Sequence, residues 1–139
     1  KPRSRFVADF IGTMNFFEGK VVAIHNGHCK IKLYDEEIVD VQRCLDLYEN
    51  QGIVFGIRPE SLRLSRSLPK EGENCIEGVI ENEVYFGDVS RYIIRLRGGY
   101  RVQVMFQNYL LKDSKMDPFE EGEKVNIIWS KTSGQVLTE

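Results

Sequence analysis

Alanine and histidine are scarce in this sequence of 139 residues, which contains two of each. Alanine is the strongest helix former, and histidine is the side chain that most often serves as a general acid or base. A mostly helical fold is therefore not expected, and few candidates remain for a catalytic base. Valine and isoleucine together number 25, and Phe, Tyr and Trp add 15. Because β-branched and aromatic residues suit pleated strands, the composition predicts a chain built mainly of β-strands.

The sequence also lacks an excess of positive charge and any long apolar run. Its 19 basic and 21 acidic side chains give a formal net charge of -2, so no overall positive field attracts phosphate backbones. Nonspecific nucleic-acid binding is therefore not expected. The apolar runs fall far short of the roughly 18 residues that a membrane span requires. The basic start, Lys1 to Arg5, precedes an apolar stretch that Asp9 interrupts, and we expect no signal peptide.

The three cysteines, Cys29, Cys44 and Cys75, are widely spaced and odd in number. This pattern predicts reduced thiols in a cytosolic protein rather than a disulfide framework. His25, His28 and Cys29 lie close together, but no fourth ligand follows with the spacing of a zinc site. The phosphate loop Gly-x-x-x-x-Gly-Lys-Ser/Thr and the motifs Gly-x-Ser-x-Gly and His-Glu-x-x-His are all missing. We therefore predict no catalytic site, no metal and no cofactor bound by this chain.

Hydrophobic patterning divides the chain into one short helix and a series of strands. Ser4 can cap a helix that Gly12 ends, with apolar residues between them on one face. Residues 20–24 and 29–33 flank Asn26-Gly27, a dipeptide that favours a tight hairpin turn. Further strands are predicted at residues 38–41, 53–57, 76–86, 92–97, 101–106, 124–129 and 135–137. Short strands separated by glycine turns indicate a small barrel or sandwich. No fixed-period repeat is visible, and the charged segment at residues 65–74 is the best candidate for a boundary between two halves.

The pattern around Gly98-Gly99 predicts the register of one hairpin. A two-residue loop would mix the faces of the two strands, whereas a loop of Gly98-Gly99-Tyr100 pairs Ile94 with Val104. One consistent apolar face results, and Arg97 then lies opposite Arg101 on the outer face. Directly opposed like charges are destabilising, so an acidic partner or screening water is expected nearby.

Charged side chains on these strands are the candidate site residues. Glutamates alternate with Ile76, Ile80 and Val84, so their carboxylates are expected to share the outer face with the arginines of the hairpin. Cross-strand ion pairs of roughly 0.2–1 kcal/mol each would then neutralise the surface. The alternative interpretation is a ligand site or an interface. The set comprises Glu77, Glu81, Glu83, Arg91, Arg95, Arg97 and Arg101.

Several motifs, taken in order, resemble the C-terminal accessory part of the ATP-binding subunit of ATP-binding-cassette importers. They are Phe6-Val7-Ala8-Asp9-Phe10-Ile11-Gly12 followed by Asn15, Gly56-Ile57-Arg58-Pro59-Glu60, Gly78-Val79-Ile80, Tyr85-Phe86-Gly87, Tyr92-Ile93-Ile94-Arg95-Leu96 and Gly122-Glu123-Lys124-Val125. The likeness spans nearly the whole chain. It implies an all-β fold of small oligonucleotide-binding-like (OB-like) β-barrels of the transport-associated (TOBE) type. Residues 1–12 would continue as a short helix from a nucleotide-binding domain. Residues 13–139 would form the regulatory domain, either as one barrel or as two interleaved halves of about 13–65 and 75–139.

The resemblance also implies a function. The accessory domain of this family is noncatalytic, pairs with its copy across an ATPase dimer and lies beside membrane permeases at the cytoplasmic face of the cell membrane. ATP and Mg would bind only in the upstream nucleotide-binding domain, so the chain is expected to be a C-terminal fragment without ATPase activity. The opening Phe-Ile-Gly-x-x-Asn is most similar to spermidine/putrescine importers, although ferric-iron and sugar importers share much of the pattern. Structural roles are assigned to the signature residues, with an ion pair or backbone cap one turn beyond the proline. These residues are Gly56, Arg58, Pro59 and Glu60.

Two other functions remain open. In the first, the barrel is a sensor that binds a polyamine through Glu77, Glu81 and Glu83 or an oxyanion through the arginines. In the second, it is a free-standing nucleic-acid-binding OB barrel that stacks bases on exposed aromatic residues beside a basic groove. The net charge of -2 argues against the second function, and the alternate placement of the aromatic residues favours core packing. The aromatic residues in question are Phe16, Phe17, Tyr85, Phe86 and Tyr92.

Overall fold

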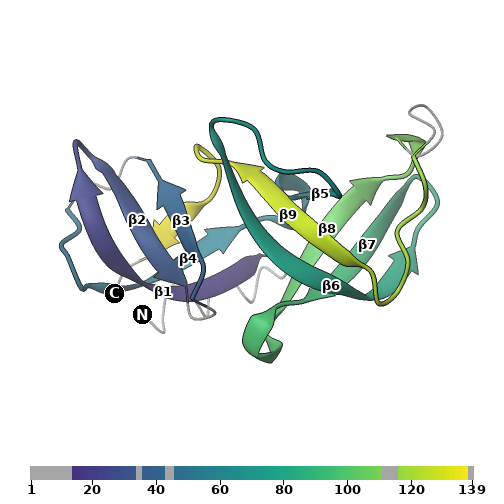
Figure 1. The fold of residues 1–139 in the computed structure, drawn as a ribbon, viewed down its shortest axis with the longest axis horizontal. Coiled ribbons are helices and arrows are strands. Elements are labelled where there is room, and N and C mark those ends of the chain that lie inside the picture. The colour runs from purple at the N-terminus through teal and green to yellow at the C-terminus, as the bar shows by residue number, and fades with distance from the viewer. Residues whose placement is uncertain (1–13, 34–35, 43–45, 111–115, 138–139) are drawn as a thin grey trace.

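The computed structural model describes residues 14–33, 36–42, 46–110 and 116–137, which form mainly β-strands (Figure 1). The strands are β1 (Asn15–His25), β2 (His28–Leu33), β3 (Ile38–Val41), β4 (Gly52–Ile57), β5 (Arg63–Ser65), β6 (Glu73–Tyr85), β7 (Val89–Arg95), β8 (Arg101–Gln107), β9 (Lys124–Ser130) and β10 (Gln135–Leu137), with single-turn 3₁₀ helices η1 (Pro59–Ser61) and η2 (Arg97–Gly99). The prediction of an all-β chain is confirmed. The helix predicted at residues 4–12 lies outside the described residues. In the part of the chain that is described, no helix is long and apolar enough to span a membrane.

The strands form two five-stranded antiparallel sheets that lie side by side (Figure 1). We call them the first lobe, with strand order β10-β4-β1-β2-β3, and the second lobe, with strand order β5-β9-β6-β7-β8. Strand β5 follows β4 in the chain but pairs with β9, and β10 follows β9 but pairs with β4. Each lobe therefore takes one edge strand from the other half of the sequence.

The two lobes repeat one arrangement of strands and key residues. An asparagine stands at the start of the central strand of each lobe, Asn15 in β1 and Asn74 in β6, and a glycine follows four residues later. A Cβ atom added to Gly19 would lie 2.7 Å from a methyl group of β2, and one added to Gly78 would lie 2.4 Å from a methyl group of β7. Only glycine therefore lets the strands approach this closely. The repeat has no fixed period because the loops between equivalent strands differ in length, which is why the sequence pattern does not show it.

Two buried asparagine side chains join the lobes reciprocally. Asn15 donates from Nδ2 to the backbone oxygen of Gln103 and accepts at Oδ1 from the Gln103 N–H, at 2.8 Å in both cases. Asn74 makes the same pair of hydrogen bonds with the backbone of Asp40, also at 2.8 Å. Gln103 lies on β8 and Asp40 on β3, which are edge strands of the two sheets. Each lobe thus supplies a side-chain amide that satisfies backbone groups on an edge strand of the other lobe.

A stack of aromatic rings fills the contact between the lobes. Trp129 of β9 faces Phe17 of β1 and Phe55 of β4, with ring centroids 6.4 and 6.2 Å apart respectively. All three side chains are at most 1% exposed. Because Trp129 belongs to the second lobe and its two partners belong to the first, the lobes share one hydrophobic core.

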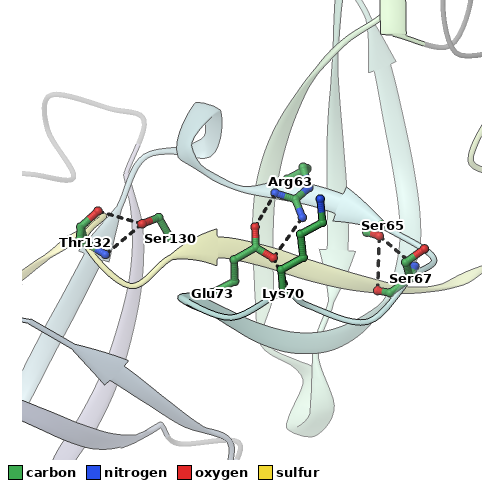
Figure 2. Close-up of polar contacts among 7 residues, drawn as sticks. All are labelled: Arg63, Ser65, Ser67, Lys70, Glu73, Ser130 and Thr132. Carbon is green, nitrogen blue, oxygen red and sulfur yellow. Dashed lines mark hydrogen bonds and ion pairs between the residues drawn. The ribbon is translucent and has the colours of Figure 1, made fainter.

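The connector between β5 and β6 is held by polar side chains (Figure 2). The Glu73 carboxylate accepts hydrogen bonds from both terminal nitrogens of Arg63, at 3.0 and 3.4 Å, and from the backbone N–H of Lys70 at 2.7 Å. The hydrogen bonds from Arg63 and Lys70 lower the pKa of Glu73. Ser65 Oγ accepts a hydrogen bond from the Ser67 N–H at 2.9 Å. This charged segment, the candidate boundary in the sequence, is therefore fixed locally to the strands on both sides.

The hairpin between β7 and β8 differs from the predicted register by two residues. Ile94 pairs with Val102, and Arg95 lies opposite Arg101. The loop is longer than predicted because both of its glycines adopt a positive φ, 81° and 87°, and form the turn η2. The prediction that Arg97 opposes Arg101 is therefore wrong. A shift of two residues preserves the alternation of side chains, so the apolar face is as predicted.

A bulge at Glu81 interrupts the alternation of β6. The pairing with β7 shifts by one residue between Ile80 and Asn82. An extra residue in one strand reverses which of the following side chains face inward. Val84, which the sequence pattern places inside, is 41% exposed. Glu83 pairs with the buried Tyr92 of β7. It therefore does not share the outer face of the sheet with Glu77 and Glu81.

Arg66 ties the segment before β9 to the second lobe. Its guanidinium forms a bidentate ion pair with the Glu123 carboxylate. It also donates hydrogen bonds to the backbone oxygens of Asp117 and Pro118, at 3.0 Å each. The guanidinium carbon also lies 4.4 Å from the ring centroid of Phe119. The hydrogen bonds from Arg66 lower the pKa of the Glu123 carboxyl, and Glu123 in turn raises the pKa of Arg66.

We expect this ion pair to contribute stability at neutral pH that is lost in acid. Because the pKa of Glu123 in the folded chain lies below its ordinary value of 4.5, the contribution is complete above that value and disappears as the pH falls through the lowered pKa. Glu123→Gln should lower the free energy of unfolding by about 1 kcal/mol near neutral pH and by less at an acidic pH where the carboxyl is protonated in the folded chain. Urea denaturation of both chains at the two pH values measures this difference. An equal loss at both pH values would contradict the role of the carboxylate.

Candidate functional site

The predicted arginines and glutamates form separate groups rather than one site. On the outer face of the second lobe, Arg101 donates to Glu81 at 2.5 and 3.1 Å, and Arg95 donates to the same carboxylate at 3.5 Å. Hydrogen bonds from Arg101 lower the pKa of Glu81, and those bonds raise the pKa of Arg101. Glu81 therefore bridges the two arginines that oppose each other across β7 and β8 and offsets one of their two positive charges. These three side chains form a structural ion-pair network.

Glu83 and Arg91 lie near the other end of β7. Glu83 accepts a hydrogen bond from the buried hydroxyl of Ser90 at 2.7 Å. The pKa of the Tyr92 hydroxyl is raised to about 12, mainly by burial and secondarily by the nearby Glu83 carboxylate. The guanidinium carbon of Arg91 lies 5.7 Å from the ring centroid of Phe86. These two charged residues therefore support the β6–β7 turn and do not join Glu81 in one site.

A cleft of about 340 Å³ lies beside the ion-pair network. Of the predicted residues, Glu77, Arg95 and Arg97 line it, and Lys124 and Glu37 complete its charged lining. Lys124 of β9 and Arg95 of β7 both pair with Val79 of β6, so they lie on the two sides of that strand. Glu37 precedes β3 of the first lobe, so we call this feature the inter-lobe cleft. Sequence reasoning missed Lys124 and Glu37 because only strand pairing and the contact between the lobes bring them to the hairpin.

The signature residues have mainly structural positions. Gly56 is buried in β4, where an added Cβ would lie 2.9 Å from a neighbouring side chain. Pro59 begins η1 and is also buried. Arg58 and Glu60 are exposed, and the backbone oxygen of Arg58 accepts a hydrogen bond from the Ser61 N–H at 3.0 Å. Among the described residues Arg58 and Glu60 form no ion pair, and of the two predicted contacts the structure shows the backbone one.

The histidines and cysteines do not gather at a metal site. His25 and His28 are exposed at the turn between β1 and β2. Within the described ranges, no group of three or more His, Cys, Asp and Glu side chains could hold a metal ion. Cys29 is disulfide-bonded, so the prediction of reduced thiols is wrong for this residue. Cys75 has a free thiol, and burial raises its pKa, which disfavours the reactive thiolate.

Two aromatic residues that the alternation assigns to the core are exposed. Phe17 and Tyr92 are each 1% exposed, whereas Tyr85 and Phe86 are 70% and 55% exposed. The latter two follow the bulge in β6, so the alternation that predicts their burial no longer applies. The inter-lobe cleft and its cations lie at the opposite end of β7. The exposed rings and those cations therefore do not form one groove.

Two family models match the chain, and together they include both lobes. The model described as TOBE domain matches residues 55–137. The chain belongs to the TOBE domain family. The model described as MalK OB fold domain matches residues 13–62 of the same TOBE chain. The resemblance carried by the sequence motifs is thereby confirmed.

Curated relatives of the TOBE chain are importer ATP-binding proteins. The spermidine/putrescine import ATP-binding protein PotA of Chromobacterium violaceum is 33% identical over 139 residues, which is 99% of this chain and 38% of the relative. PotA of Pseudomonas aeruginosa is 31% identical over 137 residues, which is 98% of this chain and 37% of the relative. The TOBE chain therefore spans little more than a third of the length of these relatives.

A solved structure shows the same fold. The cytoplasmic molybdate-binding protein ModG, crystallised with molybdate bound, matches the TOBE chain with a TM-score of 0.76 and 15% sequence identity. The match covers 88% of this chain and 94% of ModG. The predicted all-β, OB-like fold class is confirmed, and at this identity the likeness concerns the fold alone.

Proposed function

We propose that this TOBE chain is the noncatalytic C-terminal regulatory domain of the ATP-binding subunit of a polyamine importer. The observation that supports it best is the 33% identity with PotA of Chromobacterium violaceum, because that match extends over 139 residues and both lobes. The name of that relative states spermidine and putrescine import, and we take these polyamines as the cargo. The chain has no phosphate-binding loop, so ATP and Mg would bind in a nucleotide-binding domain of the same subunit.

The partners in this proposal are a second copy of the subunit and the membrane permeases. The domain pairs with its copy at the cytoplasmic face of the membrane and keeps two ATPase domains close when they separate. A tethered pair meets at a high effective concentration, so closure around ATP needs less binding energy. An effector that distinguishes two arrangements of the paired domains would then shift the population of the closed state.

The construction of the two lobes fits this regulatory role. Trp129 of the second lobe packs against two aromatic rings of the first, and the amides of Asn15 and Asn74 bond each lobe to the other. A domain held together in this way moves as one body. When one lobe contacts a partner, the other lobe therefore moves with it.

Transport assays on the full-length subunit test this proposal. Vesicles that carry the permeases and the complete subunit are expected to take up radiolabelled spermidine, and deletion of residues 14–139 should reduce uptake several-fold while the nucleotide-binding domain still hydrolyses ATP. Unchanged uptake after the deletion would contradict the regulatory role. Uptake of ferric iron or maltose in place of spermidine would contradict the cargo and leave the regulatory role intact.

A further inference from the structure

The inter-lobe cleft contains charges of both signs that the ion-pair network does not use. Arg95 is engaged by Glu81, at 3.5 Å. The side chains of Arg97, Lys124 and Glu77, by contrast, make no hydrogen bond or ion pair with any described residue. All three side chains are exposed to solvent. They line a cavity of about 340 Å³ with charges that are available to a ligand.

Strand pairing brings these charges together at the cleft. Lys124 and Arg95 flank Val79 from β9 and β7, and Glu77 lies two residues earlier on the same outer face of β6. Arg97 follows in the turn η2, where the two glycines after it place no side chain over the cleft. The cations therefore stand on both sides of one carboxylate, and the space above remains open to a small molecule.

The mixture of charges selects one class of ligand. A polyamine carries only positive charge and would meet Arg95, Arg97 and Lys124, whereas a simple oxyanion would meet Glu77 and Glu37. A molecule with an anionic group at one end and an ammonium group at the other can pair with charges of both signs, and charge-assisted hydrogen bonds are the strongest kind available to it. We propose that the inter-lobe cleft binds a small zwitterion, with its anionic group on Arg97 and Lys124 and its ammonium group on Glu77.

Binding in this cleft contacts both lobes at once. Glu37 belongs to the first lobe and the other charged lining residues belong to the second. A bound zwitterion would therefore add a further contact between the lobes. The proposal goes beyond transport and does not depend on it, because it rests only on the geometry of this chain.

Calorimetric titration of the 139-residue chain tests the proposal. The probes are ω-amino carboxylates of increasing length, namely glycine, 3-aminopropanoate, 4-aminobutanoate and 6-aminohexanoate. Butanoate, butylamine and spermidine serve as ligands with charge of one sign. We expect at least one ω-amino carboxylate to bind in a single site about tenfold or more tightly than any ligand with one sign of charge. A flat titration for all four amino carboxylates, or equal binding of butanoate or spermidine, would overturn the proposal.

Variants locate the binding in the cleft. Arg97→Ala and Glu77→Gln should each weaken the binding of the amino carboxylate about tenfold, and Lys124→Gln provides an independent third variant. Arg58→Ala is the matched control, because Arg58 is also an exposed arginine but lies outside the cleft. Binding that survives all three cleft variants, or falls equally in the control, would show that the ligand sits elsewhere. Calorimetry on this chain involves no permease and no transport, so its failure is distinguishable from a failure of spermidine transport.

Discussion

Replacing Trp129 with alanine is expected to lower the free energy of unfolding by about 3–5 kcal/mol. The indole is 1% exposed and lies against Phe17 and Phe55 of the other lobe, so its removal leaves a cavity in the shared core. Urea denaturation followed by far-ultraviolet circular dichroism measures the loss, since Trp129 is the single tryptophan and its fluorescence disappears with it. Leu68→Ala, at an 83% exposed position, should change stability by less than about 0.5 kcal/mol.

Phenylalanine at the same position separates packing from hydrogen bonding. The buried Nε1 of Trp129 has no hydrogen-bond partner in the described part of the chain. Trp129→Phe therefore loses no hydrogen bond and should recover most of the stability that Trp129→Ala loses. The wild-type chain should unfold in one transition, because Trp129 joins the two lobes. Two separate transitions in the wild-type chain would contradict a shared core.

Removing either inter-lobe amide is expected to cost about 1–3 kcal/mol, because a donor and an acceptor on the partner backbone lose their bonds. Asn74→Ala removes the hydrogen bonds of the side-chain amide to the backbone N–H and oxygen of Asp40. Asn15→Ala removes the equivalent hydrogen bonds to the backbone of Gln103. Asn82→Ala is the control, since Asn82 is exposed and its side chain hydrogen-bonds, among the described residues, only to the backbone N–H of Glu83. Urea denaturation of each variant measures the loss.

Hydrogen exchange distinguishes these amides from general packing. Asn74→Ala should speed the exchange of the Asp40 amide and leave that of Gln103 nearly unchanged, and Asn15→Ala should have the reverse effect. A uniform increase at both amides would instead indicate global destabilisation. Asn74→Asp adds a further check, because a carboxylate can accept from the Asp40 N–H but cannot donate to its backbone oxygen.

Alternation and turn chemistry were sufficient to predict most of the strands. The Asn26-Gly27 turn has φ of 52° and 80°, as a tight hairpin requires. The register near Gly98 was wrong because a glycine pair permits turns of more than one length, and residue types alone do not choose among them. The bulge at Glu81 was missed because a period of two describes a regular ladder and contains no signal for an inserted residue.

The candidate site was only partly predictable. Glu77, Arg95 and Arg97 were identified because they lie on neighbouring elements of one hairpin. Lys124 and Glu37 depend on pairing with β9 and on the contact between lobes, and these relations link distant parts of the sequence. The Asn-x-x-x-Gly at the start of both β1 and β6 is a sequence signal of the two matching lobes, but its meaning is visible only once the strands are known.

Sedimentation velocity of this chain tests the regulatory proposal most directly. A domain that tethers two ATPase subunits must pair with its own copy, so we expect a dimer to form as the protein concentration rises through the micromolar range, with or without ATP. The nucleotide should have no effect, because the sequence contains no phosphate-binding loop. A chain that remains monomeric at every concentration would contradict the tethering account.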